Sequence, residues 1–273
     1  IKIHLEEENK ILVENQKIFI SENDISGKDI FLNYNNGGVL IKDFTFKDFD
    51  DYSFQLLFDK LELNFFNYFD VKGYIDGEFY AINKRKEIPT FLSNLKIKNL
   101  NYLDYKFDTI ELVATFDKNR ISLSNLKIFN EFGSSDISGS FFLSDFNANN
   151  IKNLNIKIRN KNFRLSIIDQ LFFKQGLEGV ISGDLDLKGD MNAPIIVGNT
   201  LIKDFRYDKI SADSLKIKTT IKDGYLMVNY CDLYMDKGSY LLRGSIPITI
   251  FSSGINSIKD KNTYLDLNLK CSN

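Results

Sequence analysis

The stretch Ile110-Glu-Leu-Val-Ala-Thr-Phe116 decides the fold, because its apolar side chains recur at every second position. A β-strand turns successive side chains to opposite faces of a sheet, so this period of two predicts a strand with one continuous apolar face. The same alternation recurs along the chain, at Leu61-Leu63-Phe65, Leu95-Ile97, Leu154-Ile156-Ile158, Leu215-Ile217 and Leu265-Leu267-Leu269.

Turn-forming residues separate these runs, at Asn35-Asn-Gly-Gly38, Asp117-Lys-Asn119, Asp223-Gly224 and Asp236-Lys-Gly238. Such short connections join antiparallel neighbours, so we predict a nearly all-β chain arranged as an antiparallel meander. One segment, residues 164–173, predicts a short helix, because Leu165, Ile168 and Leu171 fall on one face at helical spacing.

The chain repeats itself with an offset of about 105 residues, and the copies keep register over more than fifty positions. Gly73-Tyr-Ile-Asp-Gly77 aligns with Gly179-Val-Ile-Ser-Gly183. Further along, glycines, turns and alternating apolar positions match in the same order, with Pro89 on Pro194, Asn94 on Asn199, Tyr102 on Tyr207, Asp108 on Asp213, the run 110–116 on 215–221, Gly133-Ser134 on Gly238-Ser239, and Gly139-Ser140 on Gly244-Ser245. Stacked repeats of this kind share one continuous hydrophobic interior.

The repeat divides the chain into three parts. Residues 1–70 are interpreted as the end of a preceding unit, with a shortened helix before Gly73. Residues 71–176 form the first repeat unit, which includes the predicted helix, and residues 177–273 form the second. The second copy stops where the helix is due and the chain begins with Ile1, so we expect an internal fragment of a longer protein.

Composition and charge argue against several classes of function. The net charge of −2 is spread without basic blocks, which disfavours a nucleic-acid surface. No stretch of 18 apolar residues occurs, so we expect any membrane anchor to lie outside this segment.

No constellation of residues predicts catalysis, a cofactor or a metal site. The single histidine, His4, has no nucleophile or acid in register with it. Asp108 and Asp213 recur at matching positions, but they stand at strand starts, where hydrogen bonds within turns account for them. Gly73 and Gly77 lie among strand residues without the lysine or helix of a phosphate-binding loop. We therefore expect that the chain is not an enzyme.

The two cysteines leave their redox state open. Cys231 aligns with Leu126 of the other copy, which predicts a packed apolar position, and Cys271 lies near the end of the chain. A disulfide between them is one alternative, and two free thiols are the other.

An ordered series of residues resembles the TamB/AsmA-like superfamily. It runs Phe163-Arg-Leu-Ser-Ile-Ile-Asp, then Gly179-Val-Ile-Ser-Gly183-Asp-Leu-Asp-Leu-Lys-Gly189, then Ala193-Pro194 and Gly198, and it ends with Gly238 to Gly244-Ser245. The resemblance covers about residues 60–273 and is clearest over 163–248. The first copy lacks the apolar-Lys-Gly continuation after Phe79, so it matches the family phrase less well.

The resemblance implies both a fold and a function. The fold is an elongated antiparallel sheet curled into a U-shaped trough, or β-taco, made of repeats. Its apolar groove would carry phospholipid or another acyl-chain lipid between inner and outer membranes, support outer-membrane protein assembly, or do both. The family also implies a periplasmic location, anchorage to the inner membrane and an outer-membrane β-barrel protein as partner. Candidates for the groove lining are apolar members of the alternating runs: Ile110, Leu112, Phe116, Leu185, Leu187, Leu215, Ile217 and Ile221.

The alternating apolar residues are also compatible with an alternative function. A structural or adhesive array of β-sandwich repeats on a surface protein would bury its apolar faces in closed cores, between paired sheets. The two hypotheses differ in whether the apolar face is covered by a second sheet or stays open.

Overall fold

A computed structural model describes residues 12–13, 18–20, 24–49, 51–66, 71–84, 88–102, 105–143, 151–169, 175–190, 193–235, 238–247 and 266–272. The chain divides into two compact units, residues 1–131 and 132–273. Each unit is described by itself below.

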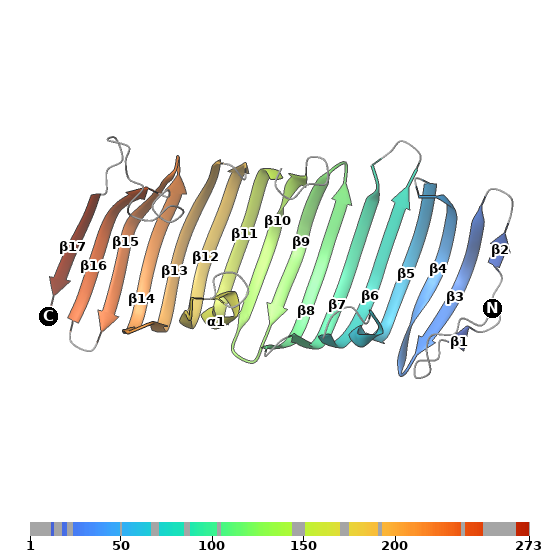
Figure 1. Ribbon diagram of the computed structural model, residues 1–273, viewed down its shortest axis with the longest axis horizontal. Coiled ribbons are helices and arrows are strands. Elements are labelled where there is room, and N and C mark those ends of the chain that lie inside the picture. Colours follow the sequence, from blue (N-terminus) through green and yellow to red (C-terminus); the bar gives the residue numbers. More distant parts are fainter. Residues whose placement is uncertain are drawn as a thin grey trace. The chain divides into compact units, whose positions relative to one another are not determined.

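The first unit is one antiparallel sheet (Figure 1). From β3 to β9, each strand pairs with the next strand along the chain. The short strands β1 and β2 both pair with β3, at different positions along it. The elements are β1 (Leu12–Val13), β2 (Ile18–Ile20), β3 (Ile25–Tyr34), β4 (Gly37–Asp48), β5 (Asp51–Glu62), the 3-10 helix η1 (Leu63–Phe66), β6 (Val71–Asn83), β7 (Thr90–Tyr102), β8 (Tyr105–Asp117) and β9 (Arg120–Phe129).

The second unit is also an antiparallel meander, from β10 to β17. Its helix α1 spans Leu165–Ile168 within the predicted 164–173, and residues 170–173 of that prediction lie outside the described part of the chain. The elements are β10 (Ser134–Leu143), β11 (Ile151–Arg164), α1 (Leu165–Ile168), β12 (Glu178–Asp190), β13 (Ala193–Tyr207), β14 (Ile210–Lys222), β15 (Tyr225–Met235), β16 (Gly238–Pro247) and β17 (Asp266–Ser272).

The strands repeat with the spacing seen in the sequence. Strands β8 and β9 begin at residues 105 and 120, and β14 and β15 begin at 210 and 225, an offset of 105 in both cases. The two-residue loops between them match as well. Lys118 and Asn119 have φ values of 47° and 64°, and Asp223 and Gly224 have 52° and 78°. Two consecutive positive φ angles are the signature of a type I′ hairpin turn, whose twist suits antiparallel strands. The local structure therefore follows the sequence repeat. The division of the chain into residues 1–70, 71–176 and 177–273 stays a prediction.

Matching β-bulges interrupt strands β5 and β11. Lys60 and Asn162 have φ values of 47° and 52°, and the register shifts beside each of them. A bulge leaves a backbone amide outside the ladder, and that amide needs another partner. The N–H of Lys60 donates to Asp76 Oδ1 at 2.8 Å, and the N–H of Asn162 donates to Ser182 Oγ at 2.9 Å. Asp76 and Ser182 occupy equivalent positions in the repeat, so equivalent side chains stabilise equivalent bulges.

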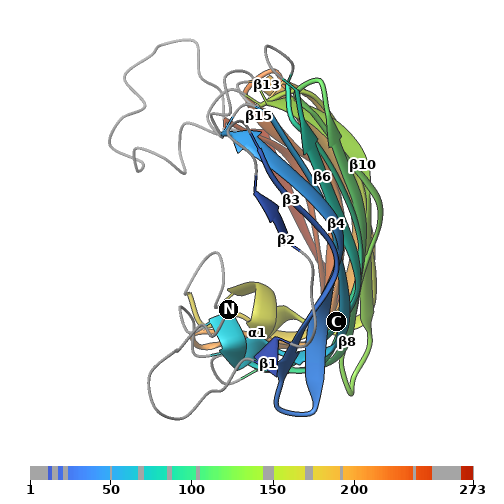
Figure 2. The same ribbon diagram turned by 90° about the vertical axis from the view of Figure 1, so that its right-hand side faces the viewer.

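Within each unit, the strands bend along their length. Figure 2 shows the bend in β3, β4 and β6 of the first unit and in β10 of the second, where α1 lies on the concave side. Neither sheet closes on itself among the described strands. The predicted fold class, an all-β antiparallel sheet curled as a trough with one short helix, is confirmed within each unit.

Candidate functional site: the apolar sheet face

In the first unit, the strand register gathers apolar side chains on one face. Residues directly opposite each other on neighbouring strands point to the same side of a sheet. Three of the predicted groove residues thus lie on one face of the sheet, each in its own cross-strand row. The pairs are Ile110 with Ile97, Leu112 with Leu95, and Phe116 with Phe91. We call this side of each unit its apolar face.

The second unit gathers the other five predicted residues in the same way. Leu215 lies opposite Ile202, and Ile217 lies two positions further along β14. Two further rows cross three strands. One runs from Leu185 through Gly198 to Thr219, and the other runs from Leu187 through Ile196 to Ile221. All five therefore lie on one apolar face.

Short helical segments cover one end of each apolar face. In the first unit, Tyr34, Val39, Leu61 and Ile75 form a buried cluster, with Leu63 of η1 packed against it. In the second unit, Leu165 of α1 is buried together with Ile202 and Leu215. These contacts identify the helix-bearing side as the apolar face, an assignment that the sequence left open.

Away from these ends, the apolar face is only partly buried. Among the eight predicted residues, Phe116 and Leu215 are buried and the other six are of intermediate exposure. In each unit, every described strand belongs to its one sheet, so no described strand forms a second layer over the face. The face presents hydrocarbon without a covering sheet among the described residues.

A row of aromatic side chains lies on the first unit's apolar face. Of its members, only Phe116 was among the predicted site residues. The ring centroids of Phe54 and Phe79 are 6.0 Å apart, those of Phe79 and Phe91 are 6.1 Å apart, and those of Phe91 and Phe116 are 5.6 Å apart. Ring pairs at such distances contribute beyond the area they bury. The sequence contains 24 phenylalanines, and only the strand register shows which of them meet.

A pocket of about 380 Å³ opens beside this row, at the end of strands β4 and β5. Its surface is almost entirely apolar, and its volume falls within the range of about 300–1,000 Å³ typical of small-molecule sites. The residues that line it are Ile41, Phe44, Thr45, Phe46, Phe49, Tyr52, Ser53, Phe54 and Leu56.

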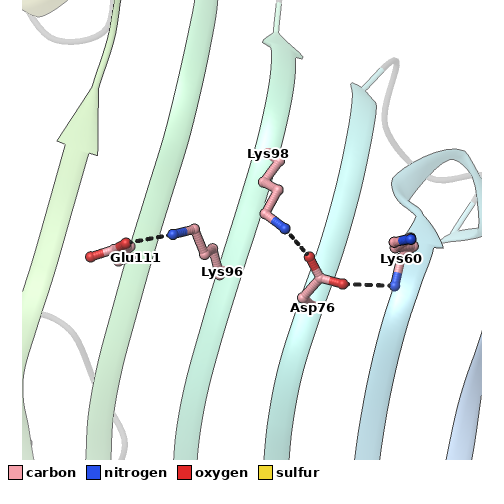
Figure 3. Close-up of polar contacts among 5 residues, drawn as sticks. All are labelled: Lys60, Asp76, Lys96, Lys98 and Glu111. Atoms are coloured by element: carbon pink, nitrogen blue, oxygen red, sulfur yellow. Dashed lines mark hydrogen bonds and ion pairs between the residues drawn. The ribbon is translucent and has the colours of Figure 1, made fainter.

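The opposite face of the first unit carries charged pairs (Figure 3). Lys96 Nζ lies 2.8 Å from Glu111 Oε1, and Lys98 Nζ lies 2.8 Å from Asp76 Oδ2. Burial on its own raises the pKa of Asp76, but hydrogen bonds from Lys98 and from the Lys60 N–H outweigh it, so the net pKa is lowered. The hydrogen bond from Lys96 lowers the pKa of Glu111. The two faces therefore differ sharply in polarity.

The lowered pKa of Asp76 predicts a pH-dependent contribution to stability. A carboxyl group whose pKa is lower in the folded state stabilises the fold above its unfolded pKa of about 3.9, and this contribution is lost as the pH falls through the folded value. We expect Asp76→Asn to lower the free energy of unfolding by about 0.5–1 kcal/mol at pH 7, and by much less at pH 3. Urea unfolding at both pH values measures the difference. Asp184→Asn is the matched control, because its side chain is 68% exposed and its carboxylate lies 3.7 Å from Arg159 Nε. An Asp76→Asn loss that is the same at both pH values would contradict the prediction.

The two cysteines are free thiols, so the disulfide alternative is not realised. Cys231 in β15 lies opposite Leu242 in β16, which lies opposite Leu269 in β17. Because β16 stands between the two cysteines, their Cα atoms are separated by about 10 Å or more, beyond the limit of about 7 Å for a disulfide. Cys231 is half-buried on the apolar face, where burial raises its thiol pKa and the charge of Asp232 adds to this.

Other kinds of site are not seen in the described part of the chain. No group of three or more His, Cys, Asp or Glu side chains is placed to hold a metal ion there. No described helix has both the length and the apolar character needed to cross a membrane. His4 lies outside the described residues.

Comparison of the chain with known protein families, with curated proteins and with solved structures returns no match.

Proposed function

We propose that this chain is a segment of a cell-envelope, bridge-like protein whose apolar face carries lipids between inner and outer membranes, supports outer-membrane protein assembly, or does both. One observation carries the proposal. In each unit a single curved sheet presents an apolar face that has no second described sheet packed against it. Large exposed apolar surfaces on proteins are usually binding sites.

Acyl chains are suitable occupants of such a face. Each buried CH₂ group contributes about 0.8 kcal/mol, and a hydrocarbon chain needs no specific hydrogen bonds to bind. Within each unit, the apolar rows that contain the groove candidates run from strand to strand, so we propose that a lipid tail moves along them without entering water. The charged pairs of the opposite face, such as Lys96 with Glu111, keep that side in solvent.

The surface-adhesin alternative is less well supported. A β-sandwich repeat would cover its apolar face with a second sheet about 10 Å away. The described strands of each unit instead continue one meander. This arrangement favours an open binding face over a closed core.

The location and the protein partner rest on the family resemblance alone. The clearest part of that resemblance, residues 163–248, supports a periplasmic segment, an inner-membrane anchor outside this segment and an outer-membrane β-barrel protein as partner. We propose no enzymatic activity, cofactor or nucleic-acid ligand.

Cys231 offers a direct test, because its thiol stands on the apolar face. In a Cys271→Ser variant it is the single thiol of the chain. We expect phospholipid, supplied as dioleoyl-phosphatidylcholine vesicles, to slow the reaction of Cys231 with a neutral maleimide about tenfold. Mass spectrometry of the purified chain is expected to find phospholipid bound to it.

A matched control places the thiol on the opposite face. Asn94 is exposed there, since it alternates with the apolar-face residue Leu95. In the variant Asn94→Cys, Cys231→Ser, Cys271→Ser, vesicles should leave the labelling rate unchanged. Equal labelling rates of Cys231 with and without vesicles, together with no bound phospholipid, would overturn the proposed function.

A further inference from the structure

We propose that the pocket at the β4–β5 end of the first unit binds the hydrocarbon end of a single acyl chain. The inference rests on the proposed function and deepens it, because it names one place on the apolar face that holds a lipid tail and the part of the lipid that is recognised. Phospholipids and free fatty acids share this chemistry, so the polar end of the lipid does not determine binding.

The pocket offers nothing to a charged or polar group. Among the described residues, no charged side chain lines it. The ion pair of Lys47 with Asp51, at 3.6 Å, lies at the end of the same two strands but is not part of the lining. Thr45 and Ser53 do line the pocket. They lie opposite each other and alternate with its aromatic residues along β4 and β5, so their hydroxyls point to the other face. A ligand group that needs hydrogen bonds would lose them here, whereas hydrocarbon loses none.

Aromatic rings build the walls and hold one another in place. The ring centroids of Phe46 and Phe49 are 5.7 Å apart, with the rings edge to face at 89°. Those of Tyr52 and Phe54 are 6.0 Å apart, and these rings are stacked at 24°. Such pairs are favourable beyond the area they bury, so they set the shape of the pocket without a ligand. Small-molecule sites are usually pre-formed in this way.

Phe49 lines the pocket although 87% of its surface is exposed, and Phe46, which its ring contacts, is 37% exposed. A phenylalanine left in water forgoes most of the free energy that its burial would contribute. A hydrocarbon chain in the pocket would cover these rings and recover part of it. The exposed rings therefore favour an apolar occupant.

The aromatic walls are not shared by the second unit. Counting six residues back from the two equivalent bulges leads to Phe54 in β5 and to Ile156 in β11. Phe54 lies opposite Phe44, whereas Ile156 lies opposite Gly139. The sheet can thus be built at this place without an aromatic pair. A role in binding accounts for the pair in the first unit.

The absence of tryptophan from the sequence makes a specific reporter available. Phe49→Trp introduces a single indole into the pocket lining at a highly exposed position, where the change costs little in folding. The probe is a lysophosphatidylcholine with an 11,12-dibromostearoyl chain, used below its micelle concentration, because bromine quenches a nearby indole. We expect quenching that saturates at one probe per protein chain. Free 11,12-dibromostearate should quench at a concentration within about threefold of this, since it presents the same chain, and a larger difference would overturn the inference.

Competitors separate the hydrocarbon from the polar end. Octanol should displace the probe at roughly tenfold lower concentration than hexanol, because each additional buried CH₂ strengthens binding about fourfold. Glycerophosphocholine, which is the polar end without a chain, should not displace it. Equal potency of the two alcohols, or displacement by glycerophosphocholine, would overturn the inference.

Substitution of a wall residue tests the place. In the Phe49→Trp chain, Phe46→Gln puts an amide into the wall and should weaken probe binding about fivefold or more. Phe46→Leu keeps the wall apolar and should retain binding to within about twofold. Phe129→Gln is the matched control, because Phe129 is also 37% exposed but lies on the opposite face, next to the apolar-face residue Ile128. Equal weakening by Phe46→Gln and Phe129→Gln would contradict the assigned place, and so would loss of binding in Phe46→Leu.

The test also separates the pocket from the proposed function. Absence of saturable quenching in a Phe49→Trp chain whose Cys231 is still protected by vesicles would overturn the pocket and leave the proposed function standing. Loss of both signals would reject the proposed function as well.

Discussion

Gly183→Ala is expected to lower the free energy of unfolding by about 3 kcal/mol or more. Gly183 has a φ of 141°, and a Cβ atom at this position would lie 2.2 Å from the backbone oxygen of Asn199 on β13. The obstacle is backbone within the sheet rather than a flexible side chain, so strands β12 and β13 must separate to relieve it. Urea unfolding of the full chain measures the loss.

Gly224→Ala is the matched control for this prediction. Gly224 also has a positive φ, 78°, but nothing lies within 4 Å of the added Cβ. Its expected cost is about 1 kcal/mol, which reflects backbone conformation alone. Equal losses in the two variants would mean that the close approach of β13 does not require glycine at position 183. A Cβ atom added at Gly77 would clash with the backbone oxygen of Asn94 in the same way, so a similar loss is expected for Gly77→Ala in the other copy of the repeat.

Leu61→Ala is expected to cost about 2–5 kcal/mol. Leu61 is 0% exposed and packs with Tyr34, Val39 and Ile75 at the end of the first apolar face that η1 covers. Removing its branched side chain leaves a cavity in a small cluster that few other buried residues can compensate. Thermal unfolding followed by circular dichroism gives the change.

Leu92→Ala provides the comparison for Leu61→Ala, since Leu92 is 43% exposed. The same chemical change should cost less than about 1 kcal/mol there. A loss below about 1 kcal/mol for Leu61→Ala would show that the covered end of the face does not stabilise the first unit.

The strands were predictable because their signal is local. Period-two alternation at 110–116 fixes both the strand and the side chains that share a face, and the turn residues Asp223-Gly224 fix the hairpin. The eight groove candidates therefore fall on the apolar faces of their units, although the alternation alone did not show which side the helices cover. That assignment needed the contact of Leu165 with Ile202 and Leu215, which joins segments far apart in the sequence.

The bulges and the pocket could not be predicted for a physical reason. Lys60 and Asn162 adopt positive φ angles inside strands, and although asparagine tolerates this conformation, lysine does not favour it, so residue type does not mark both bulges. Their bulges depend on Asp76 and Ser182 across the sheet, so no local pattern signals them. Likewise, the pocket arises from the register of β4 and β5, which the sequence does not display.

The meander order of the strands has a consequence for how each unit is made. From β3 to β9 and from β10 to β17, every strand finds its partner in the next segment along the chain. Loop closure is short at most of these steps, the segment 248–265 between β16 and β17 being the longest exception, and short closures favour rapid formation of structure. A growing polypeptide can add one hairpin at a time to an existing edge, in the order in which residues emerge during synthesis or export. No distant segment has to arrive before the earlier strands are paired, so each strand can complete its backbone pairing as soon as the next one emerges.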